Sequence, residues 1–199
     1  MNIFRVRDLL STLAWRLLGS PFFGHFGQRV RIVWPLRIVG LRGVHLADDV
    51  TLQVGAYIAV LPATPDVPGL VVGRGTQVGN HAHIIATRRV EIGEKVLIAD
   101  RVYLSDNLHD YRDVTRPVMD QPLRQTADLV IGDGSWIGEN ACLIGCTIGR
   151  HCTVGANSVV TRDVPDRCVV AGAPAVIVRR YCEASGRWRR TDAGGEFVE

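Results

Sequence analysis

The 199-residue chain has no apolar run of about 18 residues, the length that a membrane-spanning helix needs. The short apolar stretch near its N-terminus closes at Arg16, and no clean small-residue cleavage pattern follows, so we expect neither a spanning helix nor a signal peptide. The excess of one charge sign over the other is also small, with a formal net charge of +3. No basic stripe interleaved with aromatic residues is present, which argues against a nucleic-acid partner.

Cysteine is present but lacks the spacing of a structural metal site. The chain has five cysteines, an odd number, and Cys142 and Cys146 are separated by three residues rather than by the two of a zinc knuckle. We interpret these residues as small apolar side chains that pack in a reduced, cytoplasmic protein.

What the chain does contain is a six-residue repeat. An aliphatic residue, often followed by Gly or another small residue, recurs in blocks of three. The blocks are Val72, Val78 and Ile84; Ile92, Ile98 and Leu104; Ile131, Ile137 and Leu143; and Ile148, Val154 and Val160. A helix with 3.6 residues per turn cannot hold this register on one face, but short strands that turn a corner every six residues can. The sequence therefore predicts an all-β solenoid in which three hexads close one triangular coil.

The repeat divides the chain into three parts. Residues 1–28 form a predicted N-terminal extension, with apolar residues at helical spacing over residues 1–20. Residues 29–180 form the solenoid domain, whose coil is expected to begin near residue 44. Residues 181–199 are polar and charged, which predicts a flexible tail.

Two interpretations of the N-terminal amphipathic helix remain open. The favoured one is a cap that covers the end of the first coil. In the other, residues 1–20 lie on the inner face of a membrane or dock against a glycan-synthesis partner.

Two segments interrupt the hexads. Residues 62–69 are rich in proline and predict a loop. The longer break, residues 106–129, carries His109, Tyr111 and Gln121 among charged residues. A protruding loop of this length on a solenoid is typical of a functional segment.

The most ordered part of the repeat resembles a known family. Residues 130–141, 154–165 and 171–175 read VIGDGSWIGENA, VGANSVVTRDVP and AGAPA, and they resemble the hexapeptide-repeat acyltransferases over roughly residues 44–180. The resemblance implies a left-handed parallel β-helix, a homotrimer, and use of an acyl-CoA donor without a metal.

Within this family the long loop looks like the branch that O-acetylates sugars and bacterial polysaccharides. That branch often shows the pattern Asp-His-x-His-x-Tyr; here Asn107 replaces the first histidine and His109 matches the second. The resemblance implies an enzyme that uses acetyl-CoA to acetylate a sugar hydroxyl of a surface polysaccharide or exopolysaccharide, or of its precursor.

The resemblance also implies contacts with CoA. Ala156, Thr161 and Arg162 match last-coil positions along the pantetheine and phosphate path, and Arg179 matches a basic residue near the nucleotide end. Trp136 lies beside this predicted groove, where it either packs at the trimer interface, the favoured interpretation, or contacts the cofactor.

Acetyl transfer to a sugar hydroxyl requires one general base. A sugar hydroxyl is a poor nucleophile until its proton is accepted, and a neutral imidazole suits that role near neutral pH. His109 is the candidate, and Asp106 or Asp110 would orient its ring.

Two further histidines are harder to assign. His81 and His83 flank Ala82, so both are expected to face outward from a strand. With Asn80 they either belong to the acceptor pocket across a subunit interface or form a polar outer wall, which is favoured.

Three alternatives were weighed against O-acetyl transfer. N-acetylation of an amino sugar needs only the same base. A non-catalytic scaffold would leave the His109 loop without a purpose. A zinc enzyme resembling the γ-class carbonic anhydrases needs about three converging ligands, and no histidine pair five residues apart lies near His109.

Overall fold

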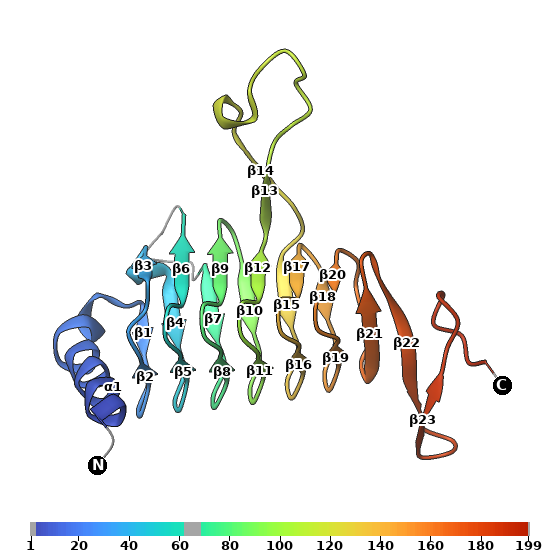
Figure 1. Cartoon of the computed structure of the whole chain (residues 1–199), viewed down its shortest axis with the longest axis horizontal. Coiled ribbons are helices and arrows are strands. Elements are labelled where there is room, and N and C mark those ends of the chain that lie inside the picture. Colours follow the sequence, from blue (N-terminus) through green and yellow to red (C-terminus); the bar gives the residue numbers. More distant parts are fainter. Residues whose placement is uncertain (1–2, 62–68, 199) are drawn as a thin grey trace.

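The computed structural model describes residues 3–61 and 69–198, which form a solenoid of short strands with a helix at its N-terminal end (Figure 1). Helix α1 (Ile3–Ala14) continues into a π-helical turn (Trp15–Gly19) and a 3₁₀ turn (Ser20–Phe22). Within the described ranges, no helix has both the length and the apolar character to cross a bilayer.

Three parallel sheets form the walls of the solenoid. Sheet 1 contains β1 (His25–Phe26), β4 (Val44–Leu46), β7 (Leu70–Val72), β10 (Val90–Ile92), β15 (Leu129–Ile131) and β18 (Thr147–Ile148). Sheet 2 contains β2 (Arg31–Ile32), β5 (Thr51–Leu52), β8 (Gln77–Val78), β11 (Leu97–Ile98), β16 (Trp136–Ile137), β19 (Thr153–Val154) and β21 (Cys168–Gly172). Sheet 3 contains β3 (Arg37–Val39), β6 (Tyr57–Val60), β9 (His83–Ala86), β12 (Tyr103–Ser105), β17 (Cys142–Ile144) and β20 (Val159–Val160).

The hexad residues build the core, as the repeat predicts. In the fifth coil Ile131, Ile137 and Leu143 come from the three walls in turn, and each is at most 1% exposed. The small residues at the corners, such as Ser135 and Ala141, are buried as well. Because every coil contributes the same set of inward side chains, the core is one continuous aliphatic column, which confirms the predicted all-β solenoid.

The corners are held by aspartates that bridge successive coils. Asp100 accepts a hydrogen bond from the backbone N–H of Asn80 in the preceding coil at 2.7 Å, and Asp133 accepts one from the N–H of Glu94 at 2.7 Å. Backbone groups that leave a strand at a corner have no partner within the ladder, and these carboxylates satisfy them.

The N-terminal limits differ from the expectation. Strand β1 begins at His25 and pairs with β4, so the first coil begins before residue 29 and well before residue 44. The sequence of this first coil lacks clear hexads, so the six-residue spacing does not reveal where the coil begins. Of the proline-rich segment, residues 62–69, only Gly69 lies within the described residues.

The C-terminal limit also differs from the expectation. Strand β22 (Ala175–Cys182) runs past residue 180 and pairs antiparallel with both β21 and β23 (Arg187–Arg190). The predicted tail from residue 181 therefore contains a hairpin that extends sheet 2. Tyr181 and Trp188, whose ring centroids lie 5.7 Å apart, pack across this hairpin, in a segment whose overall polarity gave no sign of strand pairing.

Candidate active site

The long loop leaves the solenoid at the edge where sheet 3 turns into sheet 1 (Figure 1). It opens with β13 (Asn107–His109), which pairs antiparallel with β14 (Leu123–Gln125), and a 3₁₀ turn (Val118–Asp120) lies between the two strands. The hairpin projects away from the coils above β12. The loop is thus a stiff two-stranded stalk with an irregular tip.

Asp106 anchors the base of this stalk. Its carboxylate is fully buried and accepts hydrogen bonds from the backbone N–H groups of Thr87, Arg88 and Arg89, at 2.8, 2.6 and 2.7 Å. Burial alone would raise the pKa of Asp106, but these bonds and one from the Asn107 amide outweigh it and hold the pKa below its usual value. The carboxylate fixes the loop to the preceding corner and is not available to orient His109, a correction to the sequence prediction.

The tip of the loop is braced from inside by Gln121. Its amide nitrogen donates to the carbonyl oxygens of Asp113 and Arg116, at 2.9 and 3.0 Å, and its carbonyl accepts from the Asp113 N–H at 3.2 Å. Asp110 is bound by Arg112 through its guanidinium and its backbone N–H, and these bonds hold the pKa of Asp110 well below its usual range. Asp110 is therefore also engaged elsewhere and does not orient His109.

His109 is exposed at the end of β13, opposite Leu123. Within residues 3–61 and 69–198, no hydrogen bond or ion pair engages its ring. An imidazole without a protein partner, carried on an anchored stalk, can accept a proton from a bound ligand. Among the described residues, no side chain fixes the tautomer of His109 by a hydrogen bond.

His83 lies on the outer face of sheet 3, between two tyrosines. Its ring meets those of Tyr57 and Tyr103 edge-on, with centroids 4.4 and 5.8 Å away. Burial lowers its pKa, so the ring is neutral at neutral pH. His83 pairs in register with Tyr103, six residues before His109, so the two histidines of one chain are separated by up to about 20 Å along the strand direction.

His81 and Asn80 belong to the corner that precedes β9. His81 is exposed as expected but has a left-handed backbone (φ 54°) in the turn, so it does not share a strand with His83. The Asn80 amide donates to both oxygens of Asp100 at 3.1 Å. Asn80 thus stabilises the corner, and its amide nitrogen is not free for an acceptor.

The predicted CoA residues occupy different parts of the last coils. Thr161 and Arg162 lie at the same sheet 3 to sheet 1 edge as the loop, two coils further on, which corresponds to about 10 Å at the usual strand spacing. Ala156 lies at the sheet 2 to sheet 3 edge. Trp136, 50% exposed, and Arg179 lie on sheet 2. A single chain does not bring these five residues onto one surface.

Ala156 has one feature that the sequence did not reveal. The N–H groups of its neighbours Gly155 and Asn157 donate to Val170 and Glu139, both at 2.8 Å, whereas that of Ala156 donates to no described residue. At the matching corner earlier along the same edge, Asp100 accepts this bond from Asn80, whereas the residue in register with Ala156 in the next coil is Gly172. The Ala156 N–H is therefore open to a ligand.

Buried cysteines fill the last coils. Burial raises the pKa of Cys146 to about 12 and that of Cys152 to about 11, so these thiols are unreactive packing groups. All five cysteines are free, in agreement with the interpretation from sequence. Among the described residues, no three His, Cys, Asp or Glu side chains are grouped to hold a metal ion.

Comparisons with known proteins agree with this architecture. Residues 128–162 match the family described as bacterial transferase hexapeptide (six repeats). WbbJ of Escherichia coli, named for O-acetyl transfer in lipopolysaccharide biosynthesis, is 34% identical over 57% of this chain and 62% of its own length. WcaF of the same organism, named for acetyl transfer in colanic acid biosynthesis, is 29% identical over 90% of this chain and 92% of its own.

A solved structure gives the same fold. The galactoside acetyltransferase in complex with coenzyme A superposes with a TM-score of 0.61 at 26% identity, covering 77% of this chain and 72% of that protein. Residues 128–162 carry the repeat of these bacterial transferases, and the solenoid is the left-handed parallel β-helix that the resemblance implied. The chain spans about three-fifths of the length of WbbJ, and its activity and substrate are therefore proposals.

Proposed function

We propose that this protein transfers the acetyl group of acetyl-CoA to a sugar hydroxyl of a bacterial surface polysaccharide or exopolysaccharide, or of its precursor, with His109 as general base. One observation carries the proposal: an exposed imidazole without a hydrogen-bond partner stands on a stalk whose base is pinned by a buried carboxylate. The names of WbbJ and WcaF, both acetyl transfer to bacterial glycans, support the substrate class.

The reaction would proceed by direct transfer. The neutral His109 ring accepts the proton of the acceptor hydroxyl while its oxygen bonds to the thioester carbonyl carbon. The tetrahedral intermediate collapses, the carbon–sulfur bond breaks, and the imidazolium returns its proton to the CoA thiolate. No enzyme nucleophile is required because the thioester is already activated.

The donor would be held by the last coils. The free N–H of Ala156 can donate to a carbonyl of pantetheine or to the oxyanion, and fixed backbone donors are efficient in that role. Arg162 and Arg179 are exposed and form no salt bridge among the described residues, so their guanidinium groups can pair with phosphate. Because one chain does not bring these residues onto one surface, Thr161 and the face of Trp136 would complete the donor site from neighbouring chains of a trimer.

The direct test is acetylation of glycan from cells that lack the protein. Purified protein with acetyl-CoA should release free thiol and add acetyl groups to the glycan, read by mass spectrometry. Mild alkali removes O-acetyl esters but leaves N-acetyl amides, so the same spectra separate hydroxyl from amine transfer. Acetyl groups that survive alkali would replace this proposal with N-acetylation, and no thiol release would leave the scaffold alternative.

The base is tested by His109→Asn, which keeps a polar side chain but cannot accept the proton. It should lower kcat by roughly 10²–10⁴, the usual range for loss of a general base, with acetyl-CoA affinity nearly unchanged. His81→Ala, at an exposed corner, is the matched control and should leave kcat within a few-fold. Near-normal turnover of His109→Asn would remove His109 from the mechanism.

A further inference from the structure

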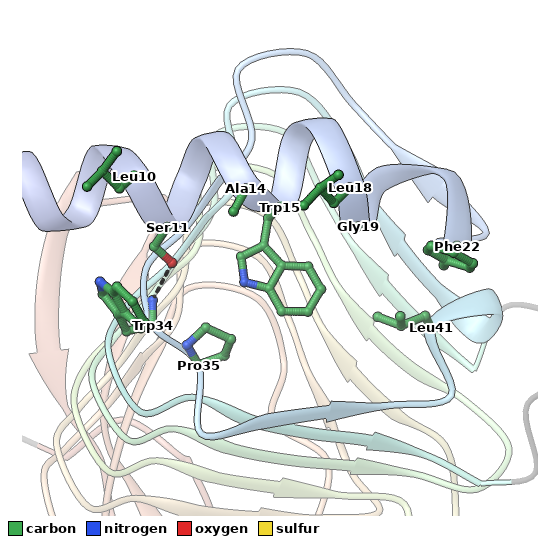
Figure 2. Close-up of a pocket in the computed structure, with 10 residues that line it drawn as sticks. All are labelled: Leu10, Ser11, Ala14, Trp15, Leu18, Gly19, Phe22, Trp34, Pro35 and Leu41. Carbon is green, nitrogen blue, oxygen red and sulfur yellow. Dashed lines mark hydrogen bonds between the residues drawn. The ribbon is translucent and has the colours of Figure 1, made fainter.

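The N-terminal helix docks on the solenoid through its polar side. The buried Ser11 hydroxyl donates to the carbonyl of Ile32 at 3.0 Å and accepts from the N–H of Trp34 at 2.9 Å, and Thr12 donates to the same carbonyl at 3.4 Å (Figure 2). The Trp34 indole N–H donates to the Arg7 carbonyl at 3.2 Å. These bonds orient the helix across the end of the first coil, as the cap interpretation expects.

Most of the remaining surface of this segment is apolar and exposed. This leucine face consists of Leu9, Leu10, Leu13, Leu17 and Leu18, which are between 51% and 73% exposed. A helix packed on a globular domain normally turns its apolar stripe inward, but here Trp15 packs against the core while these five leucines stay exposed. A contiguous apolar surface of this kind marks an interaction site.

An apolar cleft opens next to the leucine face. It has a volume of about 740 Å³, lies between the helix and the first coil, and is lined by side chains such as Trp15, Trp34, Pro35 and Leu41 (Figure 2). Leu10 and Leu18 line it from the helix, so the cleft and the leucine face form one surface.

Basic residues predominate at this end of the chain. Residues 1–43 contain seven arginines and a single acidic residue, Asp8, in a chain whose net charge is only +3. Arg16, Arg31, Arg37 and Arg42 are exposed and form no salt bridge with any described residue. Such an asymmetry predicts an anionic partner for the basic end.

We infer that this end of the molecule binds the surface of an anionic lipid bilayer. The leucine face would enter the headgroup region, the cleft would accommodate part of an acyl chain, and the unpaired arginines would contact lipid phosphates. A second copy fits this surface less well, because two such faces would bring like-charged arginine clusters together. The inference is independent of the acetyl-transfer chemistry.

Co-flotation of the purified full-length protein with vesicles is the test. We expect binding to phosphatidylcholine vesicles that contain phosphatidylglycerol, and at least tenfold weaker binding to phosphatidylcholine alone. Raising NaCl from about 0.1 M to 1 M should release the protein, because the Debye length falls from about 10 Å to about 3 Å. Equal binding to vesicles with and without phosphatidylglycerol, unchanged at high NaCl, would overturn the inference.

Matched variants separate the two components. Leu13→Glu with Leu17→Glu should abolish flotation, whereas Val114→Glu, at a 93% exposed site on the distant loop, should not. The triple change of Arg16, Arg37 and Arg42 to Gln should weaken binding on the order of 10²-fold, with Arg74→Gln as the control.

Light scattering on the same variants separates a lipid partner from a second copy. The Leu13→Glu, Leu17→Glu protein should keep the oligomeric state of the wild type. If this variant dissociates, the surface is a protein interface and the inference is wrong. The inference is also wrong if the wild-type protein does not bind anionic vesicles.

Discussion

The buried carboxylate of Asp106 carries the sharpest prediction, because one substitution tests how the loop is held. Its two oxygens accept three backbone N–H bonds from residues 87–89, a bond from the Thr87 hydroxyl at 2.9 Å, and one from the Asn107 amide at 2.9 Å. Asp106→Asn keeps the shape but turns one acceptor oxygen into an NH₂ group that faces other donors.

The cost follows from the donors that lose their acceptor. Arg88 and Arg89 both donate to the same oxygen, so replacing it leaves two buried N–H groups unpaired. Each unsatisfied buried donor costs about 1–3 kcal/mol, so we expect a loss of about 2–6 kcal/mol in the free energy of unfolding at pH 7.

The effect has a defined dependence on pH. The pKa of Asp106 is lower in the folded protein than the value of about 3.9 in an unfolded chain, so the carboxylate stabilises the fold above about pH 4. That contribution is lost as the pH falls through the folded pKa. The difference between wild type and Asp106→Asn should therefore be full at pH 7 and should shrink below pH 4.

Urea unfolding at a fixed protein concentration measures this difference, and limited trypsin digestion reports on the loop itself. Cleavage after Arg112 should be faster in the variant because its stalk opens more often. Asp48→Asn is the control: Asp48 accepts one backbone bond, from Gln28 at 2.7 Å, and should cost at most about 1 kcal/mol. Equal stability and equal digestion for Asp106→Asn and wild type would refute the anchoring role.

Two further predictions concern assembly and the donor. Light scattering at micromolar concentration should give a homotrimer, and a stable monomer would count against a site shared between subunits. Acetyl-CoA should raise Tm because it binds only the folded protein, and Arg162→Ala or Arg179→Ala should reduce that rise, with Arg187→Ala, on β23, as the control. No shift at millimolar acetyl-CoA would contradict the donor assignment.

The solenoid was predictable from sequence because its physical cause is local and periodic. Ile131, Ile137 and Leu143 must point inward from successive walls, and any other architecture would place some of them in water. The same logic fails where the period stops. Nothing in the hexad spacing shows that Asp106 reaches back to residues 87–89, because both segments lie after strands of sheet 3, where the regular hexads are interrupted.

Amphipathic spacing likewise predicts a helix without saying which side meets the protein. The spacing over residues 1–20 is helical, and the natural expectation buries the leucines. The structure instead buries Ser11, because two polar groups of the first coil, the Ile32 carbonyl and the Trp34 N–H, lie at its exposed end and need partners. That requirement exists only once the coil has formed.

The distribution of the candidate residues argues for a site completed between subunits. Within one chain, His109 stands at the end of the stalk. His83 lies on the outer face of sheet 3, up to about 20 Å away along the strand direction, and Trp136 lies on sheet 2. Arg162 is the donor candidate that shares an edge with the loop. A thioester held near Arg162 on one chain could meet the His83 and Tyr103 surface of a neighbour, where that neutral imidazole would contact the acceptor. In that proposed arrangement, the row of Tyr57, His83 and Tyr103 on the outer face of sheet 3 would line the acceptor side of the site.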